Sequence, residues 1–132
     1  MGDMDPMENP LSKKIIEAAI EVHRTLGGPG LLESVYEEAL CWELQERGLK
    51  VQRQPLCPIR YKGVELASPL RIDLLIEGLI IVECKAVSEI APVFEAQLLT
   101  YLRVTGLRLG LLLNFGQRHM KEGIRRIVNG LE

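Results

Sequence analysis

Two charged side chains lie inside an otherwise apolar segment, Ile81-Val82-Glu83-Cys84-Lys85-Ala86-Val87. Such a segment is typical of a buried β-strand, where a charged group costs several kcal/mol unless it is paired or binds a metal. Ten residues upstream, Asp73 lies in a second apolar segment, residues 70–76. The fold must therefore pair these charges or let them bind a metal. The spacing D-x(9)-E-x-K predicts a metal-dependent site that acts on phosphodiesters.

The two segments are joined by a turn signal, Glu77-Gly78, so we expect them to form an antiparallel hairpin. Side chains alternate across a strand, so Glu83 and Lys85 share one face. A three-residue loop at 77–79 would place Asp73 directly opposite Glu83, with Cβ atoms about 5 Å apart. A two-residue loop would place Asp73 opposite Val82 and send the carboxylates to different faces. The site hypothesis therefore depends on the register of this hairpin.

If Asp73 and Glu83 lie on the same face of the hairpin, their carboxylates converge on one point. They then repel each other unless a cation lies between them. Mg²⁺ prefers oxygen ligands and keeps several waters, so we predict that Asp73 and Glu83 bind Mg²⁺ or Mn²⁺. Lys85, beside the ion, could orient the attacking water or stabilise a phosphate oxygen. The alternative interpretation is a surface ion pair between Lys85 and a carboxylate across the strands.

Apolar spacing and turn residues predict the rest of the architecture. They indicate helices at residues 11–26 and 32–47, strand-like segments at 51–61, 64–76 and 79–87, a helix at 92–105 and a strand at 107–115. Pro55, Pro58 and Pro69 favour edge strands or irregular extended chain in the first two strand-like segments. Residues 121–131 fit either a short strand or a short helix. The order α-α-β-β-β-α-β predicts an α/β domain, with a mixed central sheet flanked by helices. We expect residues 1–10 to form a disordered tail and residues 11–132 to form a single domain.

The charge balance restricts how the chain could meet nucleic acid. The net charge of −2 argues against a protein that coats nucleic acid through bulk electrostatics. A local basic patch stays open, because the last third of the chain carries six basic residues with few acids among them: Arg103, Arg108, Arg118, Lys121, Arg125 and Arg126. The alternative is that these residues form a solvated charged face.

The remaining composition favours a cytoplasmic protein. No apolar run reaches the length of a membrane span, so we expect no membrane association, and the first ten residues lack the pattern of a secretory signal. The three cysteines, Cys41, Cys57 and Cys84, are an odd number without a C-x-x-C pair. They argue against a zinc or iron–sulfur site and predict reduced thiols. Cys84 is expected to face the core, opposite to Glu83 and Lys85.

Three further positions on the predicted helices could contribute to a site. Gln97 and Tyr101 are four residues apart, hence on one face of the helix that follows the E-x-K strand, and could hold a phosphate. Glu33 opens the second helix, where an acid usually complements the helix dipole. His23 could carry a proton, although a hydrogen-bonded structural histidine is the more common case.

The segment Gly30-Leu31-Leu32-Glu33-Ser34-Val35-Tyr36 matches the signature of a small prokaryotic family named for its GxxExxY motif. Further matches are Glu21-Val22-His23-Arg24, Tyr101-Leu102, Gly106-Leu107-Arg108-Leu109-Gly110 and Asn114-Phe115. The chain resembles this family over residues 11–131. The family is placed in the PD-(D/E)xK nuclease-like superfamily, so the resemblance implies a restriction-endonuclease-like αβββαβ core with an extra N-terminal helix.

The resemblance also implies an active site. In the lambda-exonuclease-like and RecB-like branches of that superfamily, an Asp, an E-x-K and a following Q-x-x-x-Y act together. The matching positions here are Asp73, Glu83, Lys85, Gln97 and Tyr101. An acid on the preceding helix often joins them, and Glu33 is the matching candidate. The resemblance thus implies an Mg²⁺-dependent nuclease with Asp73, Glu83 and Glu33 around the metal.

Three functions stay open at this point. The leading one is a metal-dependent nuclease acting on nucleic acid, since all motif residues are present. The second is a catalytically inactive interaction module on the same fold, which the net acidity and the missing basic extension favour. The third is a hydrolase of another phosphate ester. The domain is near the minimum size for this fold, so a homodimer or a protein partner could be needed to grip a substrate.

Overall fold

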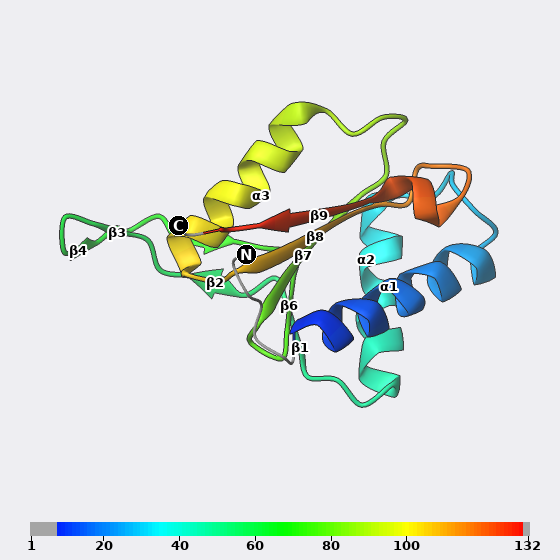
Figure 1. Cartoon of the computed structure of the whole chain (residues 1–132), viewed down its shortest axis with the longest axis horizontal. Helices are drawn as coiled ribbons and strands as arrows, with labels where there is room; N and C mark the ends of the chain where they lie inside the picture. The colour runs from blue at the N-terminus through cyan, green and yellow to red at the C-terminus, as the bar shows by residue number, and fades with distance from the viewer. Residues whose placement is uncertain (1–7, 131–132) are drawn as a thin grey trace.

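A five-stranded mixed sheet with helices on both faces forms the centre of the molecule (Figure 1). In this computed structural model, residues 8–130 of the 132-residue chain are described. The strand order is β1-β6-β7-β8-β9; β7 and β8 are parallel, and the other neighbours are antiparallel. Helices α1 and α2 pack on one face and α3 on the other, which confirms the expected α/β architecture.

The helices are α1 (Glu8–Thr25), α2 (Glu33–Glu46) and α3 (Pro92–Thr105), with a 3₁₀ turn η1 (Met120–Gly123). The strands of the central sheet are β1 (Val51–Arg53), β6 (Leu74–Ile76), β7 (Ile80–Lys85), β8 (Leu109–Asn114) and β9 (Ile124–Val128). Two short ladders lie outside it, β2 (Leu56–Cys57) with β5 (Leu70–Arg71), and β3 (Arg60–Tyr61) with β4 (Val64–Glu65). The succession α2, β1, β6, β7, α3, β8 is the expected αβββαβ core.

The hairpin of β6 and β7 has the register that the site hypothesis requires. Leu74 pairs with Val82 and Ile76 with Ile80, so residues 77–79 form a three-residue loop. Continuing this pairing by one residue brings Asp73 opposite Glu83. Glu77 and Gly78 adopt positive φ values of 54° and 67°, which allow the chain to reverse in so few residues. Of the two loop lengths left open by the sequence, the structure has the three-residue loop.

Helix α3 begins and ends at the residues expected from the sequence. Pro92 stands at its start, and Gly106 ends it in the left-handed conformation with φ 76°. Its buried side chains, Leu98 and Leu102, pack against Ile81 of the sheet. The contact with β8 is close, because a Cβ on Gly110 would lie 2.9 Å from Leu98 Cδ1. The absence of a side chain at Gly110 therefore sets the distance between α3 and the sheet.

The opposite face of the sheet carries the larger core. Ile15 of α1 and Leu40 of α2 are fully buried there, together with Val82 and Cys84 of β7. Cys84 therefore points away from the face that α3 covers, as expected for a neighbour of Glu83 and Lys85 on an alternating strand. Within residues 8–130 no helix combines the length and the apolarity needed to cross a membrane.

The first helix starts earlier than the sequence suggested. We expected residues 1–10 to be a disordered tail, but residues 8–10 form the start of α1, and residues 1–7 lie outside the described part of the chain. Pro10 is compatible with this position, because the first turn of a helix needs no hydrogen bond from the main-chain nitrogen. The boundary of the tail was therefore placed too late in the chain.

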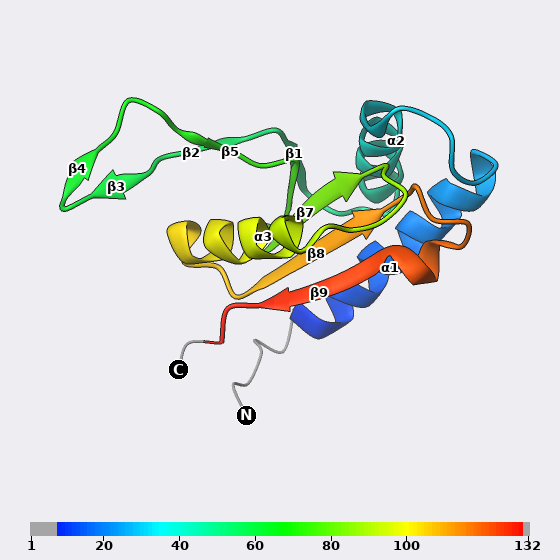
Figure 2. The same ribbon diagram turned by 90° about the horizontal axis from the view of Figure 1, so that it is seen from above.

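The strand-like segments at 51–61 and 64–76 are not continuous strands, which agrees with the irregular extended chain that their prolines favoured. Each is broken into short pieces, and the two outer ladders form an arm that extends away from the central sheet (Figure 2). Pro55, Pro58 and Pro69 interrupt these segments, and proline cannot donate a ladder hydrogen bond. In the ambiguous segment 121–131, residues 121–123 belong to η1 and residues 124–128 form β9, which pairs antiparallel with β8; residue 131 lies outside the described part of the chain.

The packing at Gly110 leads to a stability prediction. Gly110→Ala should destabilise the fold by roughly 1–3 kcal/mol, because the new methyl group overlaps Leu98. Leu98→Ala alone should cost roughly 2–5 kcal/mol through the cavity it leaves. In the double variant the methyl group gains the space that Leu98 vacates, so the two losses should sum to less than their separate values. Denaturant unfolding measures all three; strictly additive losses would contradict the close contact.

Candidate active site

Asp73 and Glu83 are joined by two hydrogen bonds at the end of the β6–β7 ladder. The main-chain N–H of Asp73 donates to Glu83 Oε2 at 2.9 Å. The main-chain N–H of Cys84 donates to Asp73 Oδ2 at 2.8 Å. Each carboxylate thus accepts from the backbone of the opposite strand, beyond the last regular pair at Leu74 and Val82. The structure brings these two expected site residues together.

The surroundings of the pair disfavour its ionisation, since Glu83 is buried and Asp73 is half-buried. Glu83 is only 6% exposed, and burial, followed by the negative charge of Asp73, raises its pKa to about 8. Burial also raises the pKa of Asp73 to about 6, with further contributions from the charges of Glu37 and Glu33. Two carboxylates whose ionisation is disfavoured by each other gain strongly from a cation between them.

Lys85 lies near the pair but forms no ion pair with it among residues 8–130. Its positive charge lowers the pKa of both Asp73 and Glu83, so the ammonium group is close enough to act on them. The Nζ atom lies 4.5 Å from the centroid of the Phe94 ring, in the first turn of α3, a cation–π contact. A direct ion pair, the alternative interpretation of the E-x-K pattern, is therefore not what the described residues form.

Helix α3 brings Tyr101 close enough to the pair for their charges to act on it. The charges of Glu83 and Asp73 act on the half-buried Tyr101 and, after the larger effect of burial, raise its pKa. Gln97 is exposed, and it lies on the same helical face as Phe94 and Tyr101 by its spacing. Tyr101 is thus placed beside the carboxylates, whereas Gln97 shares its face without a hydrogen bond to either of them.

Helix α2 contributes an acid that the sequence analysis missed. Glu37 is 3% exposed, and its Oε2 accepts hydrogen bonds from Arg53 Nε at 2.8 Å and from Gln54 Nε2 at 3.0 Å. Its charge raises the pKa of both Asp73 and Glu83. The expected acid, Glu33, is exposed and acts more weakly on Asp73. The signal for Glu37 was its position four residues after Glu33, on the same face of the helix.

The segment from Gly30 to Tyr36 anchors the start of α2. The Tyr36 hydroxyl donates to the Gly28 carbonyl at 2.7 Å and accepts from the Leu31 N–H at 3.1 Å. Its ring stacks on Phe115 with centroids 4.8 Å apart. Gly30 has φ 122°, a conformation that side chains disfavour. The glycine and the tyrosine of the motif thus shape the connection that leads into Glu33 and Glu37.

Asn114, which the sequence analysis treated only as part of a resemblance, fixes the end of the strand that carries Lys85. Its Oδ1 accepts from the N–H groups of Val87 and Gly116 at 3.0 Å each, and its Nδ2 donates to the Val87 carbonyl at 2.9 Å. The Phe115 N–H donates to the Lys85 carbonyl at 2.7 Å. The fully buried Asn114 therefore locks the chain that leaves β7 against the chain that leaves β8.

The carboxylates of Asp73 and Glu83 could bind a metal ion, although they do not form a complete set of protein ligands around it. Within residues 8–130, no group of three or more His, Cys, Asp or Glu side chains converges as a metal-binding cluster. Asp73 and Glu83 offer oxygen ligands only, which suits Mg²⁺, an ion that keeps several waters and is often held by one or two carboxylates. The pair fits such an ion; Glu33 as a third ligand stays a prediction.

Comparison with known proteins identifies one relationship. The family model described as PD-(D/E)XK nuclease superfamily matches residues 9–127. No curated protein and no solved structure matches the chain. The matched range contains all six expected site residues, from Glu33 on α2 to Tyr101 on α3.

The raised pKa of Glu83 predicts how stability changes with pH. The carboxyl group titrates near 4.5 ordinarily and near 8 in the fold, so between these values the folded state binds more protons and loses stability as the pH rises. Glu83→Gln removes this loss while keeping an oxygen for the Asp73 N–H. Without divalent ions, the variant should equal the wild type near pH 5 and exceed it by a few kcal/mol at pH 9.

Denaturant unfolding across this pH range, in the presence of a chelator, measures the effect. Glu46→Gln, an exposed acid at the end of α2, is the matched control and should follow the wild type throughout. Parallel curves for Glu83→Gln and the wild type would contradict the buried, protonated state of Glu83.

Proposed function

Because the chain belongs to the PD-(D/E)XK nuclease superfamily, we propose that it is a metal-dependent nuclease that hydrolyses phosphodiester bonds of nucleic acid. The observation that carries the proposal is the pair of the half-buried Asp73 and the buried Glu83, joined by two hydrogen bonds from the backbone at the end of the β6–β7 ladder. A pair that served only the fold would gain little from two carboxylates whose charges oppose each other.

Asp73 and Glu83 would hold Mg²⁺ or Mn²⁺, with Glu33 reaching the ion through water. When bound, such an ion lowers the pKa of a water ligand and neutralises charge that develops on the phosphodiester. Lys85 has its ammonium group restricted by the Phe94 ring, close to both carboxylates. It would orient the attacking water or stabilise a phosphate oxygen. The buried Glu37 adds negative charge that favours a cation at the pair.

Tyr101 and Gln97 would hold the substrate phosphate from the α3 side. The Tyr101 hydroxyl is protonated at neutral pH, as for any tyrosine whose pKa is not lowered, so it is available as a hydrogen-bond donor to a phosphate oxygen. The exposed amide of Gln97 is free of protein hydrogen bonds within residues 8–130 and can donate as well. Both donors lie on one helical face with Phe94, which already contacts Lys85.

Finer assignments follow from the same residues. We propose membership of the GxxExxY group, because Gly30, Glu33 and Tyr36 match its motif and Tyr36 anchors the helix that carries the acid. The three free cysteines suit the reducing conditions of the cytoplasm. A homodimer or a protein partner that helps to grip the substrate remains part of the proposal.

Metal affinity tests the pair directly. At pH 8, isothermal titration with Mn²⁺ should give a binding event that Glu83→Ala and Asp73→Asn each weaken by about tenfold or more, because each loses one of two charged ligands. Glu46→Ala, which removes an exposed acid of the same type, should bind like the wild type. Equal affinity of the wild type and Glu83→Ala would rule out the metal site.

Cleavage assays with Mg²⁺ or Mn²⁺ separate the candidate functions. The wild type should cut at least one of linear, nicked, single-stranded or structured DNA or RNA, and Lys85→Ala should lower the rate by about 100-fold or more. Lys13→Ala, on the exposed side of α1, is the control of equal charge change. Metal binding without cleavage of any nucleic acid would instead favour an interaction module, and hydrolysis of small phosphodiesters alone would favour another phosphate ester as substrate.

A further inference from the structure

Helix α2 is apolar on two sides, and only one of them packs into the core of the protein. On the core side its apolar side chains are fully buried: Tyr36, Leu40 and Leu44. An outer row follows the spacing 3-4-3 from the residue before the helix and stays accessible: Leu32, Val35, Ala39 and Trp42. Leu32 is 75% exposed, Val35 38% and Trp42 60%. This spacing is that of the a and d positions of a coiled coil, so the outer row has the form of a surface that packs on another helix.

The outer row lines a groove of about 640 Å³ between α1 and α2, the two helices that cover the same face of the sheet (Figure 1). Val35 and Trp42 line it from α2. The buried Val22 lines it from α1, together with Leu26, which directly follows that helix and is 36% exposed. An exposed tryptophan among apolar neighbours is the kind of side chain that dominates the binding energy of protein interfaces.

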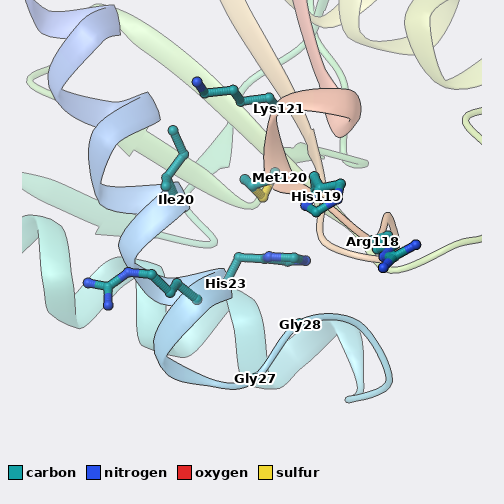
Figure 3. Close-up of a pocket in the computed structure, with 9 residues that line it drawn as sticks. Ile20, His23, Gly27, Gly28, Arg118, His119, Met120 and Lys121 are labelled. Carbon is teal, nitrogen blue, oxygen red and sulfur yellow. The ribbon is translucent and has the colours of Figure 1, made fainter.

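Both walls of the groove are held in place by contacts on other sides of the helices. His23, next to Val22 on α1, has its Nε2 atom 2.9 Å from the Gln117 carbonyl, and Figure 3 shows its ring pointing from α1 toward the loop that follows β8. The Tyr36 hydroxyl donates to the Gly28 carbonyl at 2.7 Å, which ties the start of α2 to the chain that leaves α1. The groove therefore needs little ordering before a partner binds, which lowers the free-energy cost of docking.

The α2 side of the groove is acidic. Within its bounds α2 carries five glutamates and no Lys, Arg or His: Glu33, Glu37, Glu38, Glu43 and Glu46. Glu38 and Glu43 line the groove; Glu43 pairs with Arg47, whereas Glu38 is exposed and forms no ion pair within residues 8–130. On the α1 wall, Glu21 pairs with Arg24. Glu46 continues the outer row, four residues after Trp42, at the end of α2 where the helix dipole favours a cation. The unbalanced acids, Glu38 and Glu46, therefore favour a cationic partner.

The two acids of the α2 wall flank the outer row. With Val35 and Trp42 at d positions and Ala39 at an a position, Glu38 falls at g and Glu43 at e. In coiled coils these flanking positions select the partner by pairing opposite charges. If two copies of this surface met, acids would face acids in the parallel and in the antiparallel arrangement alike. The charge therefore disfavours a second copy and favours a helix with Lys or Arg beside its apolar side chains.

We propose that the groove between α1 and α2 is a docking site for a basic amphipathic helix of a partner protein, with Trp42 as the main apolar contact and Glu38 as the main charged contact. Apolar side chains of the partner, three or four residues apart, would pack against Val35, Trp42 and Leu26. From Val35 to Trp42 the outer row spans about 10 Å, so a partner helix of about three turns covers it. The inference concerns a partner rather than the reaction and stands whether or not the carboxylate pair binds a metal.

Trp42 is the only tryptophan of the chain, so its fluorescence reports binding directly. The probe is a synthetic peptide of Leu and Lys, about 18 residues long and patterned as an amphipathic helix. In the presence of a chelator it should shift the Trp42 emission to shorter wavelength and protect the indole from acrylamide quenching. A Leu/Glu peptide of the same pattern and a Leu/Lys peptide of scrambled order should each bind about tenfold more weakly or less.

Substitutions locate the binding on this groove. With a fluorescein-labelled Leu/Lys peptide, anisotropy should show that Trp42→Ala weakens binding about tenfold or more, and that Glu38→Gln weakens it about threefold. Tyr61→Ala and Glu89→Gln are the matched controls, since they change an exposed aromatic residue and an exposed acid outside the groove. Both should bind the peptide like the wild type. Equal thermal melting of Trp42→Ala and Tyr61→Ala excludes misfolding as the cause of lost binding.

Three results would overturn the proposal. The first is that the Leu/Lys peptide leaves the Trp42 emission unchanged, or that the Leu/Glu peptide binds equally well. The second is that the wild type and Trp42→Ala bind the labelled peptide with the same affinity. The third is concentration-dependent sedimentation of the protein alone that Trp42→Ala abolishes, because a second copy would then fill the groove.

Discussion

The antiparallel register of β6 and β7 is the constraint on which the site depends. Because side chains alternate across a strand, a shift by one residue would carry Asp73 to the face that packs on α1 and α2, while Glu83 stayed under α3. The register is held twice, by a loop of three residues and by the two bonds between backbone N–H groups and carboxylates. The same geometry that makes the hairpin regular thus brings two carboxyl groups close together.

Hydrophobic packing on both faces of the sheet supports this unfavourable arrangement. Strand β7 is buried from Ile80 to Cys84, between the core under α1 and α2 and the smaller core under α3. That burial excludes water from Glu83 and so raises its pKa, and it also holds the strand in place while the charges repel. A site of this kind lowers the free energy of unfolding of the metal-free protein. A bound cation would offset that loss.

Much of the fold and part of the site could be predicted from local rules. Pro92 and Gly106 mark the ends of α3, and strand periodicity put Glu83 and Lys85 on one face. The loop length that decides whether Asp73 joins them stayed open until the structure gave the register. Tertiary packing decided the rest. In the sequence, Glu37 looks like any solvent-facing acid on a helix. Only the fold brings Arg53 and Gln54 close enough to donate hydrogen bonds to it. The Nε2 atom of His23 lies 2.9 Å from the Gln117 carbonyl, 94 positions away in the chain, and no pattern in the sequence predicts such a contact.

The direct test of a cation at the buried pair is anomalous scattering from crystals soaked in Mn²⁺. A peak between the side-chain oxygens of Asp73 and Glu83, absent from crystals of Glu83→Gln soaked in the same way, is the predicted result. Well-ordered carboxylates with no peak between them, at Mn²⁺ concentrations that saturate nucleases of the superfamily, would contradict the metal site.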